Sequence, residues 1–334
     1  MDTTNAEKEW LRRISGHSTG GETPRKPQQP EEAPAPKAPT QAAQPAKKAK
    51  QGKGFRDIAG MDHLKQMVTE GFINVLKHPK VAEAYGIRPP SMLFYGPAGC
   101  GKTFFAEKMA EEVGIHFMKV MPDDLACTWV HGTQQKIGEL FRDAEKHAPT
   151  LLFFDEFDAM VPRRTGTENN QHYDSEVNEF LCMLNNASEK GIYVLAATNH
   201  PERIDKAVLR TGRIDELVYV DMPDLEARRA LFALELSHLP CEEDIDPLRL
   251  ATLTEGYNCS DIHCIVQSAA RSKFNESISS NDGTVQCLTQ QLLEQGIAHR
   301  SPSVSPRDLR HFDHVRSELS PNDEGRRPAQ VGFC

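Results

Sequence analysis

The chain has 334 residues, of which 38% are hydrophobic and 26% are charged, a balance typical of water-soluble globular proteins. No run of residues approaches the roughly 18 consecutive apolar residues that a membrane-spanning helix requires. The N-terminal residues MDTTNAEKEWLRR lack the basic start and apolar stretch of a secretory signal. We therefore expect a cytoplasmic protein without membrane insertion, long enough for two packed units.

Charge is unevenly distributed along the chain. Residues 1–54 contain 10 Lys and Arg against 6 Asp and Glu, whereas the remainder contains 29 basic and 42 acidic residues. The acidic body argues against nucleic acid as the main partner, because phosphate contacts come from basic grooves. The 8 cysteines show no spacing typical of zinc ligands, so we expect reduced thiols.

The N-terminal region has two parts. Ala6, Trp10, Leu11 and Ile14 share one helical face, which predicts a short docking helix within residues 1–15, although a frayed terminus explains the same pattern equally well. Residues 16–54 are rich in Pro, Ala, Gln and Lys and contain almost no large apolar side chain. Such a segment cannot offset the entropy of ordering, so we expect a disordered tether.

Strands alternate with helices in the next region, residues 55–223. Five short apolar runs predict buried strands, and helix-period segments separate the first four, which predicts an α/β domain with a parallel sheet covered by helices on both faces. The remaining chain predicts a small all-helical lid with a C-terminal helix over 224–319 and a disordered tail over 320–334. The predicted strands are Met92–Tyr95, Phe117–Val120, Leu151–Phe154, Ile192–Ala197 and Leu217–Val220.

A phosphate-binding loop follows the first strand. The sequence GPAGCGKT fits the pattern G-x-x-x-x-G-K-[ST], whose backbone N–H groups and following helix N-terminus surround phosphates. Lys102 would reach the β- and γ-phosphates, and the Thr103 hydroxyl would bind magnesium. A glycine-rich turn before a helix can be only a turn, but the Lys-Thr pair favours the phosphate site. The candidate nucleotide contacts here are Pro97, Ala98, Gly99, Cys100, Gly101, Lys102, Thr103 and Phe104.

Polar residues follow two further strands. Asp155 and Glu156 end the run LLFFDE, and Asn199 ends AATN. Ligands bind beyond the carboxyl ends of parallel strands, so these residues are expected beside the loop. Asp155 would hold magnesium, Glu156 would activate the attacking water, and Asn199 would sense the γ-phosphate. Each residue alone could be an ordinary strand end, and the assignment depends on their combination.

These motifs closely resemble the AAA ATPases proper, the group that contains katanin, spastin, valosin-containing protein and the vacuolar-sorting ATPases. The resemblance runs from Gly54 to about Leu319 and includes FRDIAG, GIRPPSMLFYGPAGCGKT, LLFFDEFDAMVPRR, AATNHPERID, VLRTGRID and GYNCSDI. It implies an ATP- and Mg²⁺-dependent hydrolase built as a homo-hexamer. It also implies that Asp57, Ile58 and Ala59 pack around adenine and that Tyr257 faces the nucleotide from the lid.

The resemblance further implies residues that act between subunits. Arg210 and Arg213 match arginine fingers, which stabilise charge on the phosphoryl group bound by the adjacent subunit and are worth about 10³ to 10⁵ in rate. Trp129 and Val130 match a pore loop that grips extended polypeptide. The chain departs from the family there, because His131 stands at the glycine position. It also lacks the family's Asp-Gly turn near Asn186 and a recognisable substrate-binding domain before the tether.

Three functions are compatible with these features. The first is a ring that remodels, unfolds or disassembles an unidentified protein substrate by pulling it through a central pore, with an adaptor bound through the N-terminal tail. The second is a nucleotide-gated scaffold or regulator that recruits partners without threading. The third is a nucleic-acid motor, which only the basic tether supports. Cys100 is either a small residue that fills a turn, which we favour, or a redox-sensitive thiol, because a helix N-terminus can lower a thiol pKa.

Overall fold

The computed structural model describes residues 54–125, 132–163, 180–185, 187–210, 212–279 and 284–319, with the backbone alone at 132–134. Several predictions lie outside these residues. They are the docking helix within 1–15, the tether up to residue 53, the pore-loop residues Trp129 and Val130, and the tail from residue 320.

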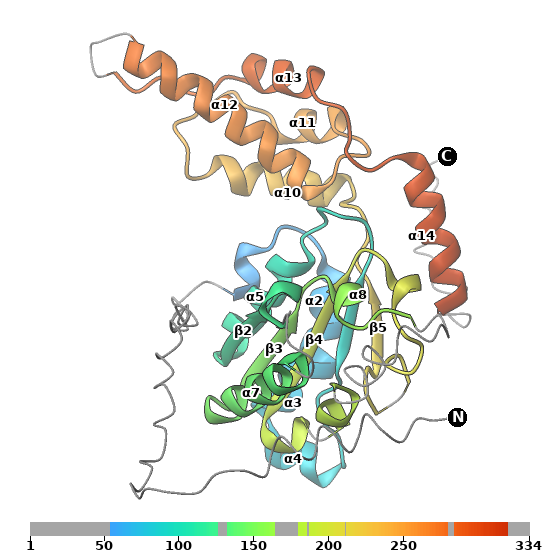
Figure 1. Cartoon of the computed structure of the whole chain (residues 1–334). Helices are drawn as coiled ribbons and strands as arrows, with labels where there is room; N and C mark the ends of the chain where they lie inside the picture. Colours follow the sequence, from blue (N-terminus) through green and yellow to red (C-terminus); the bar gives the residue numbers. More distant parts are fainter. Residues whose placement is uncertain are drawn as a thin grey trace, which may run out of the picture. The chain divides into compact units, whose positions relative to one another are not determined.

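The centre of the fold is a five-stranded sheet (Figure 1). The strands follow the order β2-β3-β4-β1-β5, and every pair is parallel, which confirms the predicted sheet. Each observed strand lies within one residue of its predicted bounds at either end, because a buried apolar run and its backbone ladder nearly coincide. The strands are β1 (Met92–Tyr95), β2 (His116–Val120), β3 (Thr150–Phe154), β4 (Ile192–Thr198) and β5 (Glu216–Tyr219).

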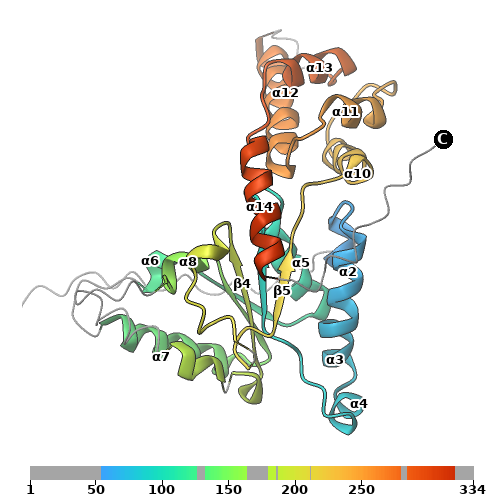
Figure 2. The same cartoon turned by 90° about the vertical axis from the view of Figure 1, so that its right-hand side faces the viewer.

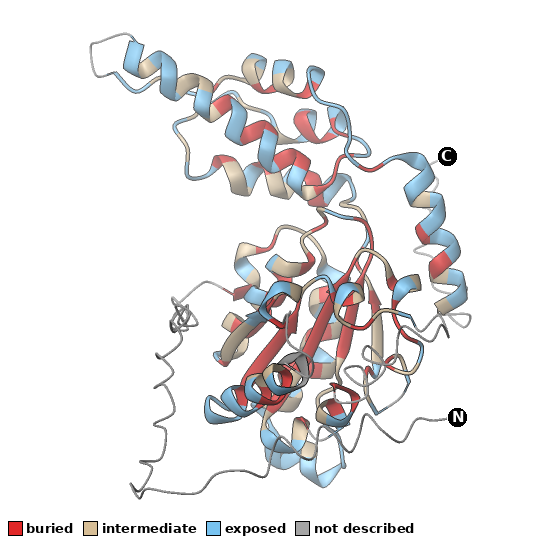
Figure 3. Cartoon of the chain, viewed as in Figure 1, coloured by how far each residue is buried: buried red, intermediate tan, exposed pale blue. Residues whose placement is uncertain are grey.

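Two apolar layers cover the faces of the sheet (Figures 2 and 3). Alternate residues of a strand point to opposite faces, so Phe94 packs in one layer and Leu93 in the other. The Phe94 layer is closed by η1 (Gly54–Asp57), α2 (Asp62–Val68), the π-helical segment η2 (Thr69–Ile73), and α5 (Lys102–Val113), with α3 (Asn74–Lys77) and α4 (Pro79–Ala84) continuing from η2. The Leu93 layer is closed by α6 (Pro122–Leu125), α7 (Gly132–Lys146), α8 (Phe157–Met160), and a helical stretch at 180–185.

The lid contains four helices in the described residues after 223, before the C-terminal helix. Asp224 and Asp246 accept hydrogen bonds from backbone N–H groups of the first turns of α10 and α11, and so begin those helices. Phe232, Leu250 and Leu293 are fully buried between them. The helices are α10 (Leu225–Leu236), α11 (Pro247–Leu253), α12 (Cys259–Ser279) and α13 (Gln290–Ala298).

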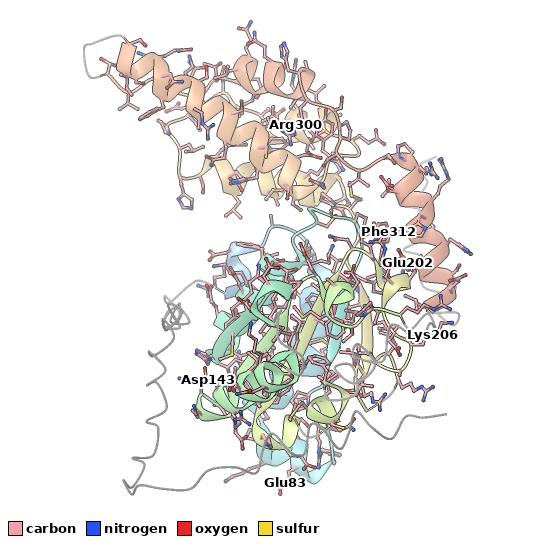
Figure 4. The ribbon with its side chains drawn as sticks, viewed as in Figure 1. Glu83, Asp143, Glu202, Lys206, Arg300 and Phe312 are labelled. Carbon is pink, nitrogen blue, oxygen red and sulfur yellow. The ribbon has the colours of Figure 1, made fainter. Side chains whose placement is uncertain are left out.

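The C-terminal helix α14 (Pro306–Leu319) lies beside β5. Phe312 is buried, with its ring centroid 6.4 Å from that of Tyr219, and the Arg316 guanidinium lies 5.1 Å from the same Tyr219 ring. His311 Nε2 is 3.7 Å from the carboxylate of Glu202, which belongs to the 3-10 turn η5 (Pro201–Arg203) after β4 (Figure 4). Within the described residues, no helix has the length and apolar character needed to cross a membrane.

Candidate nucleotide site

The loop between β1 and α5 depends on glycine. Gly96, Gly99 and Gly101 have φ values of 147°, 76° and 88°, which residues other than glycine rarely adopt. A Cβ on Gly96 would lie 2.2 Å from the Val220 carbonyl oxygen, and one on Gly99 would lie 2.4 Å from the Asn258 amide. The chain therefore forms a tight loop that ends at the N-terminus of a twelve-residue helix, where unpaired N–H groups favour anions.

Lys102 lies inside this loop. Only 8% of the residue is exposed, and Nζ donates to the carbonyl oxygens of Gly96 at 2.9 Å and Pro97 at 2.8 Å. Burial lowers the pKa of Lys102 to about 8, so the ammonium form still dominates at neutral pH. The structure thus holds one cation directly beneath the anion-binding backbone.

Two oxygen atoms meet where a divalent ion would be expected. Thr103 Oγ1, on the first turn of α5, donates to Asp155 Oδ2 beyond the end of β3 over 3.1 Å. Hydroxyl and carboxylate oxygens are hard ligands of the kind that Mg²⁺ prefers, so the two side chains fit this ion. Lys119 Nζ lies 2.8 Å from the same Asp155 oxygen. We did not predict this contact, although a lysine within an otherwise apolar strand was the available signal.

The neighbouring strand ends bring two more predicted residues to the same edge. Tyr95 pairs with Thr198 in the sheet, so Gly96 and Asn199 follow adjacent strand ends. Asn199 Oδ1 is buried and has no hydrogen-bond partner among the described residues. Glu156 follows Asp155 directly and has φ 51°, a rare value for a residue other than glycine. A strained residue and a buried amide oxygen without a partner at one edge are typical of a functional site.

The segment before α2 borders this edge. Asp57 pairs with Lys108 of α5 at 2.9 Å, and Ile58 is buried beside α5. A Cβ on Gly60 would lie 2.5 Å from Cβ of Ala227, so the segment also touches the first turn of α10. The structure therefore places Asp57, Ile58 and Ala59 between the phosphate-loop helix and the lid.

The lid contacts the phosphate loop through residues that we did not single out. Asn258 Nδ2 donates to the carbonyl of Ala98 at 3.0 Å, and Ser260 N donates to the carbonyl of Gly99 at 3.1 Å. Asp261, 1% exposed, receives hydrogen bonds from Ser303 and Arg300. Burial alone would raise the pKa of Asp261, but these hydrogen bonds outweigh burial and hold it below its usual value. The turn before α12 is thus fixed against the loop.

Tyr257 occupies a different place from the one expected. Its ring is buried in the lid core, and its hydroxyl donates to the backbone carbonyl of Arg300 and, at 3.4 Å, to that of Ile297. The neighbouring Asn258 contacts the loop instead. A buried tyrosine needs a partner for its hydroxyl, and the end of α13 supplies it.

The surroundings of Cys100 argue against a redox-sensitive thiol. The residue is fully buried, and Sγ lies 3.6 Å from Sδ of Met222. Burial, reinforced by nearby acidic groups, raises the pKa of Cys100 to about 12, despite the opposing charge of Lys102. Desolvation outweighs the expected effect of the helix N-terminus, which favours the alternative that Cys100 is a small residue filling the turn.

Arg210 and Arg213 lie away from this chain's own phosphate loop. Arg210 is exposed, and Arg213 Nη1 donates to the carbonyl of Ala207 at 2.7 Å. Both precede β5, whose first residue pairs with Met92 at the start of β1. The phosphate loop begins at the other end of β1, about 10 Å further along at about 3.3 Å per residue. The structure therefore does not bring these arginines to the site formed by Lys102, Thr103 and Asp155.

The fold and the site together define a P-loop nucleotide-binding domain followed by a helical lid. Residues 92–222 match the family described as "ATPase family associated with various cellular activities (AAA)". The chain therefore belongs to the AAA group of ATPases, as the resemblance of its motifs indicated.

Several relatives align with most of this chain. The Cell division cycle protein 48 homolog of Archaeoglobus fulgidus is 33% identical over 271 residues, which are 78% of this chain and 37% of the relative. The ATPase family gene 2 protein homolog A of Homo sapiens is 33% identical over 267 residues, or 79% of this chain and 29% of the relative. The Cell division control protein 48 homolog C of Arabidopsis thaliana is 32% identical over 285 residues, or 82% and 34%. The chain thus spans about a third of the length of these relatives.

Proposed function

We propose that this protein binds ATP with Mg²⁺, hydrolyses it as a ring of identical subunits, and uses the cycle to remodel, unfold or disassemble protein substrates. The observation that carries the proposal is the convergence of Lys102, Thr103, Asp155 and Asn199 on one edge of the parallel sheet. The number of subunits, six, is taken from the family resemblance.

The phosphate end of the nucleotide would lie on the loop 96–103. Backbone N–H groups and the N-terminus of α5 attract the phosphates, and the Lys102 ammonium can exchange its two carbonyl partners for phosphate oxygens, because charge-assisted hydrogen bonds are the stronger ones. Thr103 and Asp155 would hold the magnesium ion, which would neutralise charge on the phosphates. Asp57, Ile58 and Ala59 would border the adenine.

Hydrolysis requires a base and a group that orients the water. Glu156 is the proposed base, because its carboxylate follows the magnesium ligand Asp155 and can accept a proton from the attacking water. Asn199 would orient this water through Oδ1, which has no partner in the described residues, or would donate a hydrogen bond from Nδ2 to the γ-phosphate. Neither role requires a residue from another subunit.

Charge on the transferring phosphoryl group requires a further cation. Arg210 is exposed and lies toward the opposite end of β1 from the phosphate loop, which supports a role on a neighbouring subunit rather than on its own site. We propose the same direction for Arg213, after release of its bond to Ala207. Activity would then depend on assembly, because each site would borrow arginines from the adjacent copy.

A direct test compares the wild type with Glu156→Gln. We expect both to bind a fluorescent ATP analogue in the presence of Mg²⁺ and to form rings by light scattering, whereas phosphate release by the variant falls by at least about 100-fold, the scale of lost general-base catalysis. Lys102→Ala should bind no nucleotide. Equal hydrolysis by wild type and Glu156→Gln would contradict the assignment of the base.

Action on proteins needs its own measurement. With purified rings and an unfolded model protein, the remodelling proposal expects turnover to rise on addition of the protein and to lose this stimulation in Trp129→Ala. Because His131 stands where the family has a pore-loop glycine, the scaffold alternative should be tested together with the remodelling proposal. A scaffold would recruit partners equally well in wild type and Glu156→Gln, whereas a remodelling ring would release them only when ATP is hydrolysed.

A further inference from the structure

A lysine occupies part of the magnesium position. Lys119 lies on β2 opposite Phe153 of β3, and Asp155 is two residues beyond Phe153. Since alternate residues of a strand share a face, the Lys119 side chain can run along that face to the edge of the sheet. Its Nζ ends 2.8 Å from Asp155 Oδ2, the oxygen that also accepts the Thr103 hydroxyl.

The nearby cations are not equivalent. Lys102 Nζ donates to two loop carbonyls and acts on Asp155 through its charge alone. Lys119 touches the carboxylate directly. Its side chain is 36% exposed, against 20% for that of Asp155, so the ammonium reaches the pair from the solvent side and has room to withdraw. Lys119 thus compensates the charge of Asp155 without being locked in place.

We propose that Lys119 is a resident cation that holds Asp155 and Thr103 in position and must give way to Mg²⁺, and so sets the magnesium concentration needed for nucleotide loading. This inference rests on the proposed ATP-binding function. Lys119 acts through Asp155 and Thr103, so it is a positioning residue and not a catalytic one.

Two physical effects follow from this geometry. Mg²⁺ binds oxygen at about 2.0 to 2.1 Å and keeps several waters, so an ammonium hydrogen-bonded to Oδ2 occupies space that the hydrated ion needs. Once displaced, the tethered ammonium stays near the ion and repels it, and salt screens this repulsion. Removal of the charge should therefore strengthen Mg²⁺ binding, most visibly at low ionic strength.

A different role predicts the opposite result. If Lys119 instead turned to the phosphates when nucleotide binds, its removal would weaken nucleotide binding even at saturating Mg²⁺. One experiment distinguishes these roles. If Lys119 competes with Mg²⁺, its removal changes the half-saturating Mg²⁺ concentration. If Lys119 binds the phosphates, its removal weakens nucleotide affinity at saturating Mg²⁺.

The test measures binding of a fluorescent ADP analogue across a series of free Mg²⁺ concentrations, together with direct Mn²⁺ binding by electron paramagnetic resonance. Lys119→Met keeps the apolar stem and removes the charge, and Lys119→Arg keeps the charge. Lys146→Met is the matched control, because Lys146 pairs with Asp143 on the exposed end of α7. Folding of each variant is checked by thermal melting without divalent ions.

We expect Lys119→Met to lower the half-saturating Mg²⁺ concentration about two- to fivefold, as a partly exposed charge pair allows, and to tighten Mn²⁺ binding in parallel. Lys119→Arg and Lys146→Met should follow the wild-type curve. An unchanged or higher half-saturating Mg²⁺ concentration in a folded Lys119→Met would overturn the inference and leave nucleotide binding standing. Absence of analogue binding by the wild type at every Mg²⁺ concentration would instead remove the proposed function, and this inference with it.

Discussion

Single side chains at the phosphate loop show how burial competes with charge. Lys102 and Cys100 lie two residues apart on the same loop, and burial moves the two pKa values in opposite directions, because it disfavours the charged form of each group. The lysine remains mostly cationic at neutral pH, which the phosphate-binding proposal needs. The thiol remains neutral, so we expect it to react slowly.

Cys100 should therefore be a slow nucleophile. Its pKa rises from 9.0 to about 12, which lowers the thiolate fraction near neutral pH by about 1,000-fold. We expect iodoacetamide to label exposed Cys182 and Cys264 in the folded protein well before Cys100. Mass spectrometry of digests taken over time measures the order, and unfolding in urea should equalise the rates. Labelling of Cys100 as fast as Cys264 in the folded protein would contradict the burial argument.

Sequence reasoning succeeded for residues whose position follows from a strand end and failed for those set by tertiary contacts. Gly96, Asp155 and Asn199 each follow an apolar run, and a parallel sheet brings such ends together. Lys119 and Asn258 reach the site through a long side chain and through the docking of the lid. A lysine within an apolar strand was the only local signal for Lys119. The motif GYNCSDI contains Asn258, but we expected its contact from Tyr257, which instead packs in the lid core.

A tertiary contact sets the start of one lid helix. Helix α13 begins at Gln290, because Leu288 N donates to the Pro240 carbonyl in an extended pairing and the Thr289 side chain caps Leu292 N. The start of this helix therefore depends on a segment almost fifty residues away in the chain. Such contacts limit the accuracy of predicted helix ends.

The C-terminal helix α14 docks with a buried aromatic side chain, Phe312. Phe312 is 6% exposed against Tyr219, so Phe312→Ala should cost about 3 kcal/mol locally, at the lower end for loss of a buried aromatic ring. We expect amide hydrogens of residues 309–319 to exchange faster by roughly 100-fold, as measured by mass spectrometry. His314→Ala, on the exposed side of the same helix, is the control and should leave exchange nearly unchanged. Similar exchange in both variants would show that Phe312 does not hold the helix.

Arg210 and Arg213 would act in catalysis only in the assembled ring. Arg210 and Arg213 are separated from their own phosphate loop by the length of β1, so under the proposed function one polypeptide would contain both halves of a catalytic site without joining them. A neighbouring copy would supply the missing half. Hydrolysis would then be a property of the interface between subunits.

Mixing two inactive variants tests this account most directly. Arg210→Ala/Arg213→Ala keeps Glu156 but lacks the arginines, whereas Glu156→Gln keeps the arginines but lacks the base. We expect each variant alone to hydrolyse ATP at most about 1% as fast as the wild type, and an equimolar mixture to regain a clear fraction of that rate, because some interfaces then combine an intact Glu156 with intact arginines. If the mixture stays as inactive as its components while light scattering shows mixed rings, the arginines do not act on a neighbouring subunit and the central claim is wrong.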